Sequence, residues 1–365
     1  MEEITQDNVL DVAVIGGGPA GTAAAITAAR QGFSVALLEA GSFPRHKVCG
    51  EFISSEALPI LKSLVARELL DDVTLIKNTR VFLDNRVVDF RVEPAGASLS
   101  RHALDFELWK SALAAGVCAR DRVRVTAVQK TQSFFAIQSG REQLKARAVI
   151  DASGRWSNLS RTKRVTDDHW IGLKQHFFED NPPPHCDLYF FPGGYCGVQS
   201  LGNGTINVAA MVRADVARSL SMVFVRHRDL ERRSRFWRPA SEVVATAPLL
   251  FGKPRTTNAE TVLVGDAAAF IDPFAGDGIS RALHSGRLAA LSLEPYLRGE
   301  CSLQTALRRY DRAHNELLQP ALRAAARLRR LLQLPKALRL TALSLIKFPP
   351  LAHLAVQHTR VRKIA

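Results

Sequence analysis

The chain contains 365 residues, of which 47% are hydrophobic and 23% are charged, so it can build a sizeable core and is not globally disordered. Its five cysteines are scattered and include no C-x-x-C pair, which argues against a disulfide framework or a metal site and favours a reducing compartment. The start, MEEITQDN, does not resemble a signal peptide, and the most apolar late stretch is broken by charges and prolines. We therefore expect a cytoplasmic protein without a bilayer-spanning segment.

The first forty residues predict a β-α-β unit. Residues 9–15 form an apolar run, Gly16-x-Gly18-x-x-Gly21 follows, an Ala-rich helix occupies residues 21–30, and a second apolar run ends at Glu39. Glycines at this turn let a pyrophosphate approach a helix N-terminus, and a terminal acid can bind a ribose. Because Glu39 would repel a 2′-phosphate, FAD or NAD is favoured over NADP. The alternative is a glycine turn that serves packing only. The predicted contacts here are Gly16, Gly18, Pro19, Ala20, Gly21, Glu39 and Ala40.

Segments typical of an antiparallel sheet interrupt the segments typical of a nucleotide-binding fold. Residues 80–92 and 186–213 alternate between apolar and polar. A helix is expected over 104–115 and a buried strand over 147–150, as in a parallel sheet. This order predicts two interleaved domains.

A second glycine-rich turn lies at residues 261–290. A strand ends at Gly265-Asp266, the turn runs through Gly276-Asp277-Gly278, and a helix is expected over 279–297. Asp266 could bind a polyol hydroxyl, and the helix N-terminus could face an anionic ring. A capped helix with a structural turn is an equally good interpretation. A further helix is expected over 303–334, with a break at Pro320.

Four segments resemble one flavoprotein family. The run GDAAAFIDPFAGDGI is similar to the second FAD motif of the geranylgeranyl reductase family, which is related to the p-hydroxybenzoate hydroxylase-like monooxygenases. The run PRHKVCGE at 44–51 resembles the family's P-x-x-K-x-C-G segment, and SRHALDFEL at 100–108 resembles its R-x-x-x-D-x-x-L helix start. The run VIDASGRWS at 149–157 lies where the family has a DG segment. Together with the first glycine motif, these matches extend over residues 9–290.

The resemblance implies FAD as the cofactor. It places the first glycines at the pyrophosphate, Glu39 at the adenosine ribose, and Arg101 with Asp266 along the ribityl–phosphate chain. Residues 276–279 would approach the isoalloxazine ring. The further implied contacts are Cys49, Gly50, Arg101, Gly154, Gly265, Asp266, Gly276, Asp277, Gly278 and Ile279. Because DASGR replaces the Asp-Gly pair that helps NADPH in hydroxylases, the electron donor is left open between NAD(P)H and a reductase partner.

Two residues are candidates for catalysis, Cys49 and Tyr195. Cys49 follows Arg45, His46 and Lys47, whose charges would favour a thiolate. Its two interpretations are a proton donor and, preferred here, a small residue packed against flavin. Tyr195 in FPGGYCGV could face a substrate cavity or pack in a turn. The isolated His176, His284 and His314 are expected to be core or surface residues rather than catalysts.

These observations predict an α/β chain, α+β overall. A Rossmann-like FAD-binding domain (1–75, 96–165 and 255–300) would be interleaved with an antiparallel-sheet substrate domain (76–95 and 166–254), followed by C-terminal helices in a basic region (301–365). The expected function is FAD-dependent oxidation or reduction of a hydrophobic small molecule, of polyprenyl or polyketide type. Reduction of a C=C bond and hydroxylation by a flavin hydroperoxide both fit. The alternatives are a flavin-containing nucleic-acid-binding protein and a flavoprotein electron carrier without its own substrate.

Positive charge gathers late in the chain. Residues 301–365 contain 13 Lys or Arg and two acids, which is +11 of the total +14. Within 321–347, Arg323, Arg327 and Arg330 recur at helical spacing. Packing on the FAD domain with solvated arginines is the preferred interpretation, followed by peripheral contact with a membrane and then by nucleic-acid binding. A second cluster, residues 226–238, holds six arginines and could belong to the same face.

Overall fold

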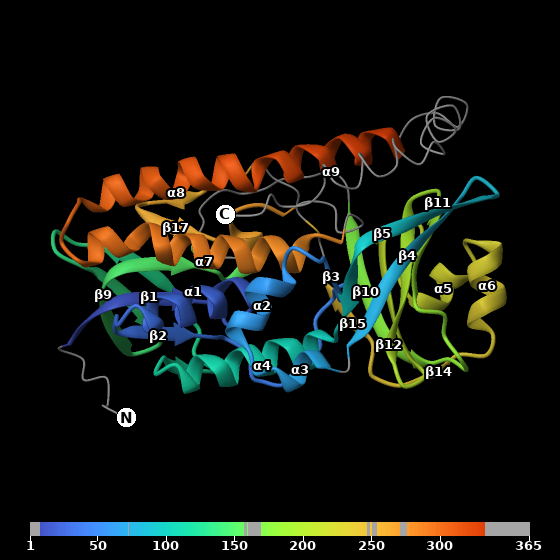
Figure 1. Cartoon of the computed structure of the whole chain (residues 1–365), viewed down its shortest axis with the longest axis horizontal. Coiled ribbons are helices and arrows are strands. Elements are labelled where there is room, and N and C mark those ends of the chain that lie inside the picture. The colour runs from blue at the N-terminus through green and yellow to red at the C-terminus, as the bar shows by residue number, and fades with distance from the viewer. Residues whose placement is uncertain are drawn as a thin grey trace.

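Two β-sheets stand side by side and helices cover their outer faces in the computed structural model (Figure 1). The structure describes residues 8–71, 73–156, 159, 169–246, 249, 254–270 and 276–332. Ser157 of the fourth family-like segment and residues 333–365 of the basic region therefore lie outside the described residues. No helix within the described ranges has the length and apolar character to cross a bilayer.

The first sheet, sheet A, is a parallel sheet with an antiparallel extension. Its order is β16-β17-β9-β1-β2-β6, in which β16 pairs antiparallel with β17, and β8 and β7 extend the sheet antiparallel from β9. Its central strands are short apolar runs with both faces covered, as parallel strands require. The strands are β1 (Val9–Ile15), β2 (Val35–Leu38), β6 (Cys118–Arg120), β7 (Ala127–Lys130), β8 (Phe135–Ser139), β9 (Glu142–Asp151), β16 (Thr257–Asn258) and β17 (Thr261–Leu263).

Two helices that cover sheet A pack so closely that one of their contact positions has room only for glycine. Helix α1 (Pro19–Arg30) lies against α7 (Gly278–Leu297). A Cβ on Gly286 of α7 would lie 2.0 Å from the carbonyl oxygen of Ala20. This contact brings the starts of both helices to the same edge of sheet A. The other helices are α2 (Leu58–Leu64), α3 (Glu68–Asp71), α4 (Arg101–Ala114), α8 (Leu303–Leu317) and α9 (Gln319–Leu332).

The second sheet, sheet B, runs β14-β10-β13-β12-β11-β4-β5-β3, with β15 also paired to β10. Its pairs are antiparallel except for β11 with β4. Alternate residues of β10 face opposite ways: Leu173 and Phe177 pack under α5 (Leu220–Phe224) and α6 (Arg228–Ser234), whereas Lys174 and His176 face sheet A. The strands are β3 (Phe52–Ile53), β4 (Thr74–Leu83), β5 (Arg86–Ser98), β10 (Trp170–Phe178), β11 (His185–Phe191), β12 (Gly194–Gly202), β13 (Thr205–Arg213), β14 (Arg238–Pro239) and β15 (Val244–Thr246).

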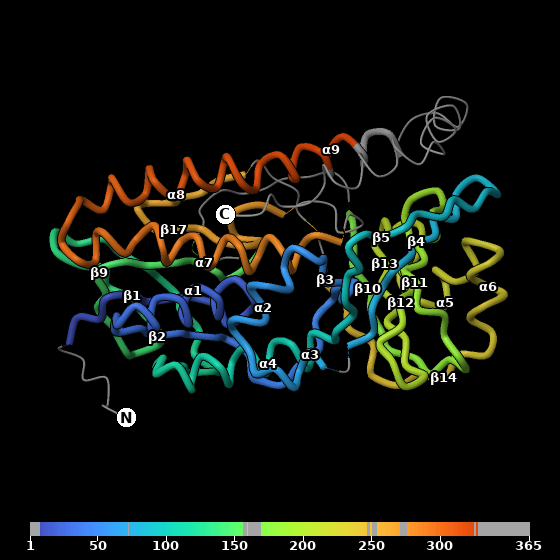
Figure 2. Tube along the Cα trace, in the orientation of Figure 1, coloured from blue at the N-terminus to red at the C-terminus, as the bar shows by residue number. Residues whose placement is uncertain are grey.

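The chain passes repeatedly between the two sheets (Figure 2). Strands β3 to β5 and β10 to β15 belong to sheet B and are inserted between strands of sheet A. The predicted fold class, an α/β fold with a second, largely antiparallel sheet and C-terminal helices, is confirmed. The residue limits given above for the two domains stay a prediction.

The C-terminal helical segment breaks two residues earlier than predicted. Helix α8 ends at Leu317, and Pro320 is the second residue of α9. Proline is tolerated there because N–H groups in the first turn of a helix have no acceptor within the helix. Leu303, Ala306, Tyr310 and His314 of α8 face inward, and the Tyr310 hydroxyl donates to the Leu263 carbonyl at 2.8 Å. The apolar face of α8 is thus used in packing on sheet A.

Replacing Gly286 tests the close helix contact. In Gly286→Ala the Cβ must push α1 and α7 apart, which we expect to cost about 3 kcal/mol in the free energy of unfolding. This outweighs the roughly 0.5–1 kcal/mol that alanine gains in a helix. Gly197→Ala in β12 is the control, because its Cβ meets Leu188 at an ordinary 3.4 Å. Urea unfolding of both variants measures the difference; equal stability would contradict the packing described.

Candidate functional site

A cavity of about 520 Å³ opens where the strands of sheet A end. Its walls follow β1, β2, β9 and β17 at their carboxyl ends, the usual position for ligands in parallel sheets. All predicted FAD contacts except Gly21 and Asp277 line it. The lining positions among them are Gly16, Gly18, Pro19, Ala20, Glu39, Ala40, Cys49, Gly50, Arg101, Gly154, Gly265, Asp266, Gly276, Gly278 and Ile279.

The three glycines of the first motif have different roles. Gly16 has a φ of +106°, and a Cβ there would lie 2.3 Å from the Ala152 carbonyl oxygen. A Cβ on Gly21 would lie 1.8 Å from the Gly16 carbonyl oxygen. Both glycines therefore serve chain packing. Gly18 is different, because the nearest atom to its Cβ position is a nitrogen of Arg101 at 3.9 Å. It leaves room for a ligand beside the start of α1.

Two helix N-termini meet at this cavity. Gly18 precedes α1 and Gly278 begins α7, and neither N-terminus is capped by a side-chain hydrogen bond or carries an acid in its first turn. The free N–H groups and the helix dipoles therefore favour anionic ligand groups. Gly278, like Gly18, has space around its Cβ position. A diphosphate at α1 and an electron-rich ring edge at α7 fit this arrangement, so the residues present suit FAD.

Glu39 is held in its ionised form at the edge of the cavity. Its carboxylate accepts hydrogen bonds from the Gly17 and Gly41 amides, both at 2.8 Å, and lies 2.9 Å from Arg45. Burial opposes the charge, but Arg45 and the amides outweigh it and lower the pKa of Glu39. The carboxylate is placed to accept from the hydroxyls of a ribose.

Cationic side chains are fixed along the middle of the cavity. Arg101 forms a bidentate ion pair with Asp105, with both distances 2.6 Å. Burial opposes its charge, yet the Asp105 carboxylate prevails and raises the pKa of Arg101. Arg155 lies 3.5 Å from Asp266, and its guanidinium carbon is 3.9 Å from the Phe270 ring centroid. These groups fit a phosphate-bearing chain.

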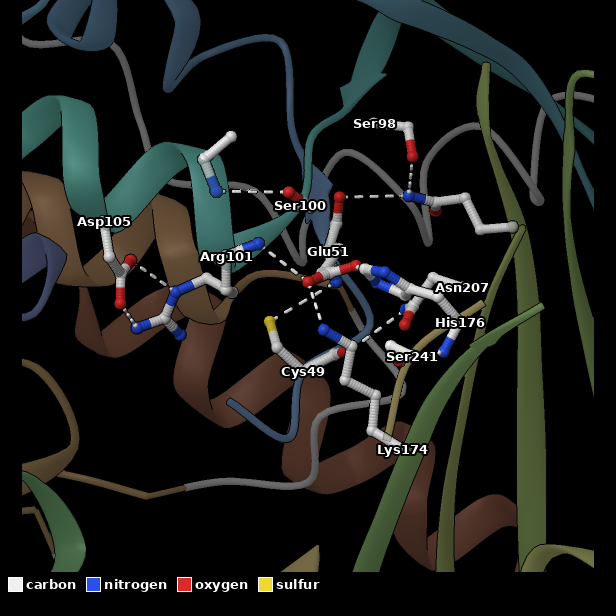
Figure 3. Close-up of polar contacts among 12 residues, drawn as sticks. Cys49, Glu51, Ser98, Ser100, Arg101, Asp105, Lys174, His176, Asn207 and Ser241 are labelled. Atoms are coloured by element: carbon white, nitrogen blue, oxygen red, sulfur yellow. Dashed lines mark hydrogen bonds and ion pairs between the residues drawn. The ribbon is translucent and has the colours of Figure 1, made fainter. Parts of the chain in front are cut away.

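A buried carboxylate joins this cavity to sheet B (Figure 3). Glu51, which has a φ of +59°, is inaccessible to solvent. One carboxylate oxygen accepts from Lys174 Nζ and, at 2.7 Å, from the Arg101 amide; the other lies 2.7 Å from His176 Nε2. Burial raises the pKa of Glu51. Hydrogen bonds and charges from His176 and Lys174 lower it by a larger amount, so the net shift of the pKa is downward. Glu51 is therefore a buried anion with a buried cation beside it.

Histidines extend this cluster toward the cavity. The His46 ring lies 4.9 Å, between centroids, from both His102 and His176, and His46 lines the cavity. Burial and the positive charge of Lys174 hold the pKa of His46 at about 4. It is therefore neutral near pH 7. The expectation that His176 stands alone is wrong, because β10 carries it to Glu51, 125 residues away in the chain.

Cys49 is held at the cavity wall by the Glu51 amide and by Asn207 of sheet B. Its Sγ accepts from the Glu51 amide at 3.3 Å, and its carbonyl accepts from Asn207 Nδ2 at 3.0 Å (Figure 3). Arg101 also contacts the thiol. The thiol is thus fixed where it can approach a bound molecule, as either interpretation of this residue requires.

Tyr195 lies behind the wall rather than on it. It is buried with Met211, Leu249 and Phe270, and of these Phe270 lines the cavity. The catalytic role of Tyr195 stays a prediction. His284 and His314 are buried in the core, as expected. The sequence analysis missed Glu51, Lys174 and His46 as site residues.

Comparison with known proteins agrees with these features. Residues 11–157 match the family model described as FAD dependent oxidoreductase. The chain is 27% identical to the digeranylgeranylglycerophospholipid reductase of Methanocella arvoryzae (86% of this chain, 84% of the relative). It is 29% identical to the menaquinone reductase of Mycobacterium tuberculosis (79% and 77%).

Two solved structures share the fold. A geranylgeranyl bacteriochlorophyll reductase-like protein from Thermoplasma acidophilum superposes with a TM-score of 0.78 at 22% identity, covering 96% of both chains. The flavin-dependent brominase Bmp2 superposes with a TM-score of 0.80 at 21% identity (96% of this chain, 93% of the brominase).

The fold, the glycine-lined cavity and the family match define an FAD-dependent oxidoreductase, which confirms the predicted cofactor and enzyme class. Within that class, the chain is similar to a digeranylgeranylglycerophospholipid reductase and to a menaquinone reductase, in agreement with the geranylgeranyl reductase resemblance of its four sequence segments.

Filling the open space at Gly18 should displace FAD. In Gly18→Leu the side chain would project where the diphosphate is expected, without meeting the chain itself. We expect FAD affinity to fall at least about 100-fold, the loss of two or more charge-assisted hydrogen bonds, with little change in stability of the FAD-free protein. Flavin absorbance after gel filtration measures retention. Wild-type retention would show that the diphosphate lies elsewhere.

Removing the charge of Glu51 should destabilise the chain in a pH-dependent way. At neutral pH, Glu51→Gln leaves Lys174 buried without its counter-charge, a loss of about 3–5 kcal/mol in unfolding free energy. Because the pKa of Glu51 is lowered in the fold, its contribution is complete at neutral pH and disappears as the pH falls below its ordinary value near 4.5. The difference in unfolding free energy between Glu51→Gln and the wild type should therefore become smaller at acid pH.

Glu142→Gln is the control for this variant, since it breaks an exposed ion pair with Arg120 and should cost less than about 1 kcal/mol. Urea titrations at several pH values measure both variants. A gap for Glu51→Gln that stays constant from neutral to acid pH would contradict an ionised carboxylate.

Proposed function

We propose that this enzyme reduces carbon–carbon double bonds in a long isoprenoid-type substrate. The observation that carries the proposal is the thiol of Cys49, fixed on the wall of the cavity between Arg101 and the Glu51 amide. A thiol can donate the proton that a reduced double bond needs. The names of the two curated relatives, both reductases of isoprenoid-bearing lipids, support the same substrate class.

The cavity offers apolar surface for such a substrate. Val48, Phe52, Phe270 and Ile279 line it together with the polar groups already described. An isoprenoid chain has no polar group for a hydrogen bond, so apolar contact must bind it. A polyketide-type ring would use the same surface.

When bound, reduced FAD would supply the hydride for one carbon of the double bond. Cys49 donates its proton to the other carbon, so that the S–H bond, the π bond and the bond that held the hydride break, two C–H bonds form and the flavin is left oxidised. Arg101 stabilises the resulting thiolate by its charge, and a proton from water restores the thiol. Neutral His46 lies in the same cavity wall.

Hydroxylation is the other reaction that the predicted class allows. Its support is weaker at this site, because a cavity-facing thiol is readily oxidised where an oxygen-transferring species forms. The donor of electrons, NAD(P)H or a reductase protein, is part of the proposal and is decided by the first experiment below. Nucleic-acid binding and electron carriage without a substrate remain the alternatives from the sequence.

We also infer that the enzyme acts at a membrane surface, because the proposed substrates are lipids. The basic region 301–365 is the contact predicted from sequence. In it, Ala321 and Leu322 of α9 are buried, and most of segment 321–347 lies beyond the described residues.

Anaerobic stopped-flow mixing of the flavin-loaded protein with NADPH, NADH or dithionite, followed by substrate or oxygen, tests the proposal. Digeranylgeranylglycerophospholipid and menaquinone are the substrates to use. Flavin reoxidation that depends on the lipid and yields a saturated bond supports reduction. Reoxidation only by oxygen, with oxygen incorporated into the product, would overturn it.

Cys49→Ala should separate proton donation from flavin binding. We expect lipid reduction to slow at least about 100-fold, the usual contribution of a general acid, with FAD content and reduction by dithionite unchanged. Cys118→Ala on β6 is the control and should behave as wild type, since Cys118 does not line the cavity. A normal rate in Cys49→Ala would leave the thiol a packing residue.

A further inference from the structure

The outer face of sheet B carries a cluster of buried aromatic rings at its far end. Phe177 of β10, Phe224 of α5 and Trp237 pack together, with ring centroids 5.3–5.9 Å apart. Helices α5 and α6 lie over this face, at the end of the molecule farthest from β1 and β2 (Figure 1). The cluster brings the end of α5 and the segment after α6 to one place.

Large apolar side chains next to this cluster in the chain point into solvent. Val225 follows Phe224 and is 61% exposed, and Phe236 precedes Trp237 and is 85% exposed. Met222 lies three residues before Val225, on the same side of α5, and is 44% exposed. Leu220 and Val223 of α5 are buried. The apolar surface that α5 and residue 236 leave outside is therefore not needed for the fold.

Exposed arginines flank these apolar residues along the chain. Residues 218–238 contain seven arginines and two acids, Asp229 and Glu231. Only Arg233 turns inward, where it binds Glu179 and Asp187 at 2.6–2.7 Å. The other six are exposed, and within the described part of the chain Arg228 and Arg238 form no ion pair. The outward arginines are Arg218, Arg226, Arg228, Arg232, Arg235 and Arg238.

We propose that this α5–α6 surface, defined by Met222, Val225, Phe236 and the six outward arginines, docks on the anionic headgroup layer of a lipid bilayer. Guanidinium groups bind lipid phosphates, and a phenylalanine with aliphatic neighbours enters the boundary between headgroups and acyl chains. Charge complementarity favours an anionic partner. Met222 and Val225 favour a bilayer over nucleic acid, because aliphatic side chains do not stack on bases.

Docking at this surface would hold the substrate-facing sheet beside the bilayer. The opposite face of the same sheet carries Lys174 and His176, which contact Glu51 of the cavity wall. The surface consists of residues 218–238, whose arginine cluster could not be placed from the sequence, and it includes none of the basic region 301–365. The inference does not depend on the proposed reduction, since binding to vesicles needs no turnover.

Vesicle sedimentation of the flavin-loaded full chain tests the proposal. The probes are vesicles of phosphatidylcholine alone and of phosphatidylcholine with about one-third phosphatidylserine, the anionic lipid that attracts basic segments. We expect binding to the anionic vesicles and little to the neutral ones. The triple variant Arg228→Gln, Arg232→Gln and Arg235→Gln should weaken binding on the order of 100-fold, and Phe236→Ala about tenfold or more.

A matched triple variant distinguishes this surface from net charge. Arg67→Gln, Lys130→Gln and Arg141→Gln removes three exposed cations elsewhere and should bind nearly as wild type. Unaltered binding by the α5–α6 triple variant would overturn the proposal even if the whole chain binds through 301–365. Three other results would also overturn the proposal: no vesicle binding by the wild type, equal losses of binding in both triple variants, or binding of RNA but not of vesicles through these arginines. Flavin content and melting temperature confirm that each variant is folded.

The variant Phe236→Trp gives a direct readout of contact. Its added fluorescence should shift to shorter wavelength on anionic vesicles and be quenched by brominated lipid, beyond the change in wild type. Binding to vesicles without extra quenching would place the contact elsewhere and contradict the proposal.

Discussion

The site depends on one buried interaction, the carboxylate of Glu51 with Lys174 and His176. It ties the loop after β2 to β10 of the other sheet, and the same side chain accepts the Arg101 amide at the start of α4. A buried anion of this kind is tolerated only with its partners in place. Cys49 precedes Glu51 by two residues, and its thiol accepts a hydrogen bond from the Glu51 amide. The position of the thiol therefore follows from the contact between this loop and sheet B.

Several titratable side chains near the cavity are each held in one protonation state. Glu39 and Glu51 are stabilised as anions by Arg45 and Lys174, respectively, and Arg101 as a cation by Asp105. His46 is kept neutral by burial and by its cationic neighbours. These groups need little reorganisation when a charged cofactor binds, which is how preorganised sites gain affinity and selectivity.

Local features could be predicted from the sequence because their physics is local. The Gly16–Gly21 turn, the helix after it and the strand before Glu39 follow from neighbouring residues, and they gave the correct fold class and cofactor. The Glu51 cluster could not be predicted in that way. Lys174 and His176 lie 123 and 125 residues from Glu51 in the chain. Only the fold of β10 against the Glu51 loop brings them to it, on one face of the strand. Their spacing of two was the one available signal, and His176 was instead interpreted as isolated.

The interleaving of the two sheets limits how this protein can diversify. Sheet B enters the chain twice, so no single crossover or fusion point could exchange it for another sheet while keeping sheet A intact. Relatives with other substrates must then arise by substitution on the inner face of the sheet and in the loops that border the cavity. The outer face is free of that demand, so its apolar and basic residues can change under a separate selective pressure.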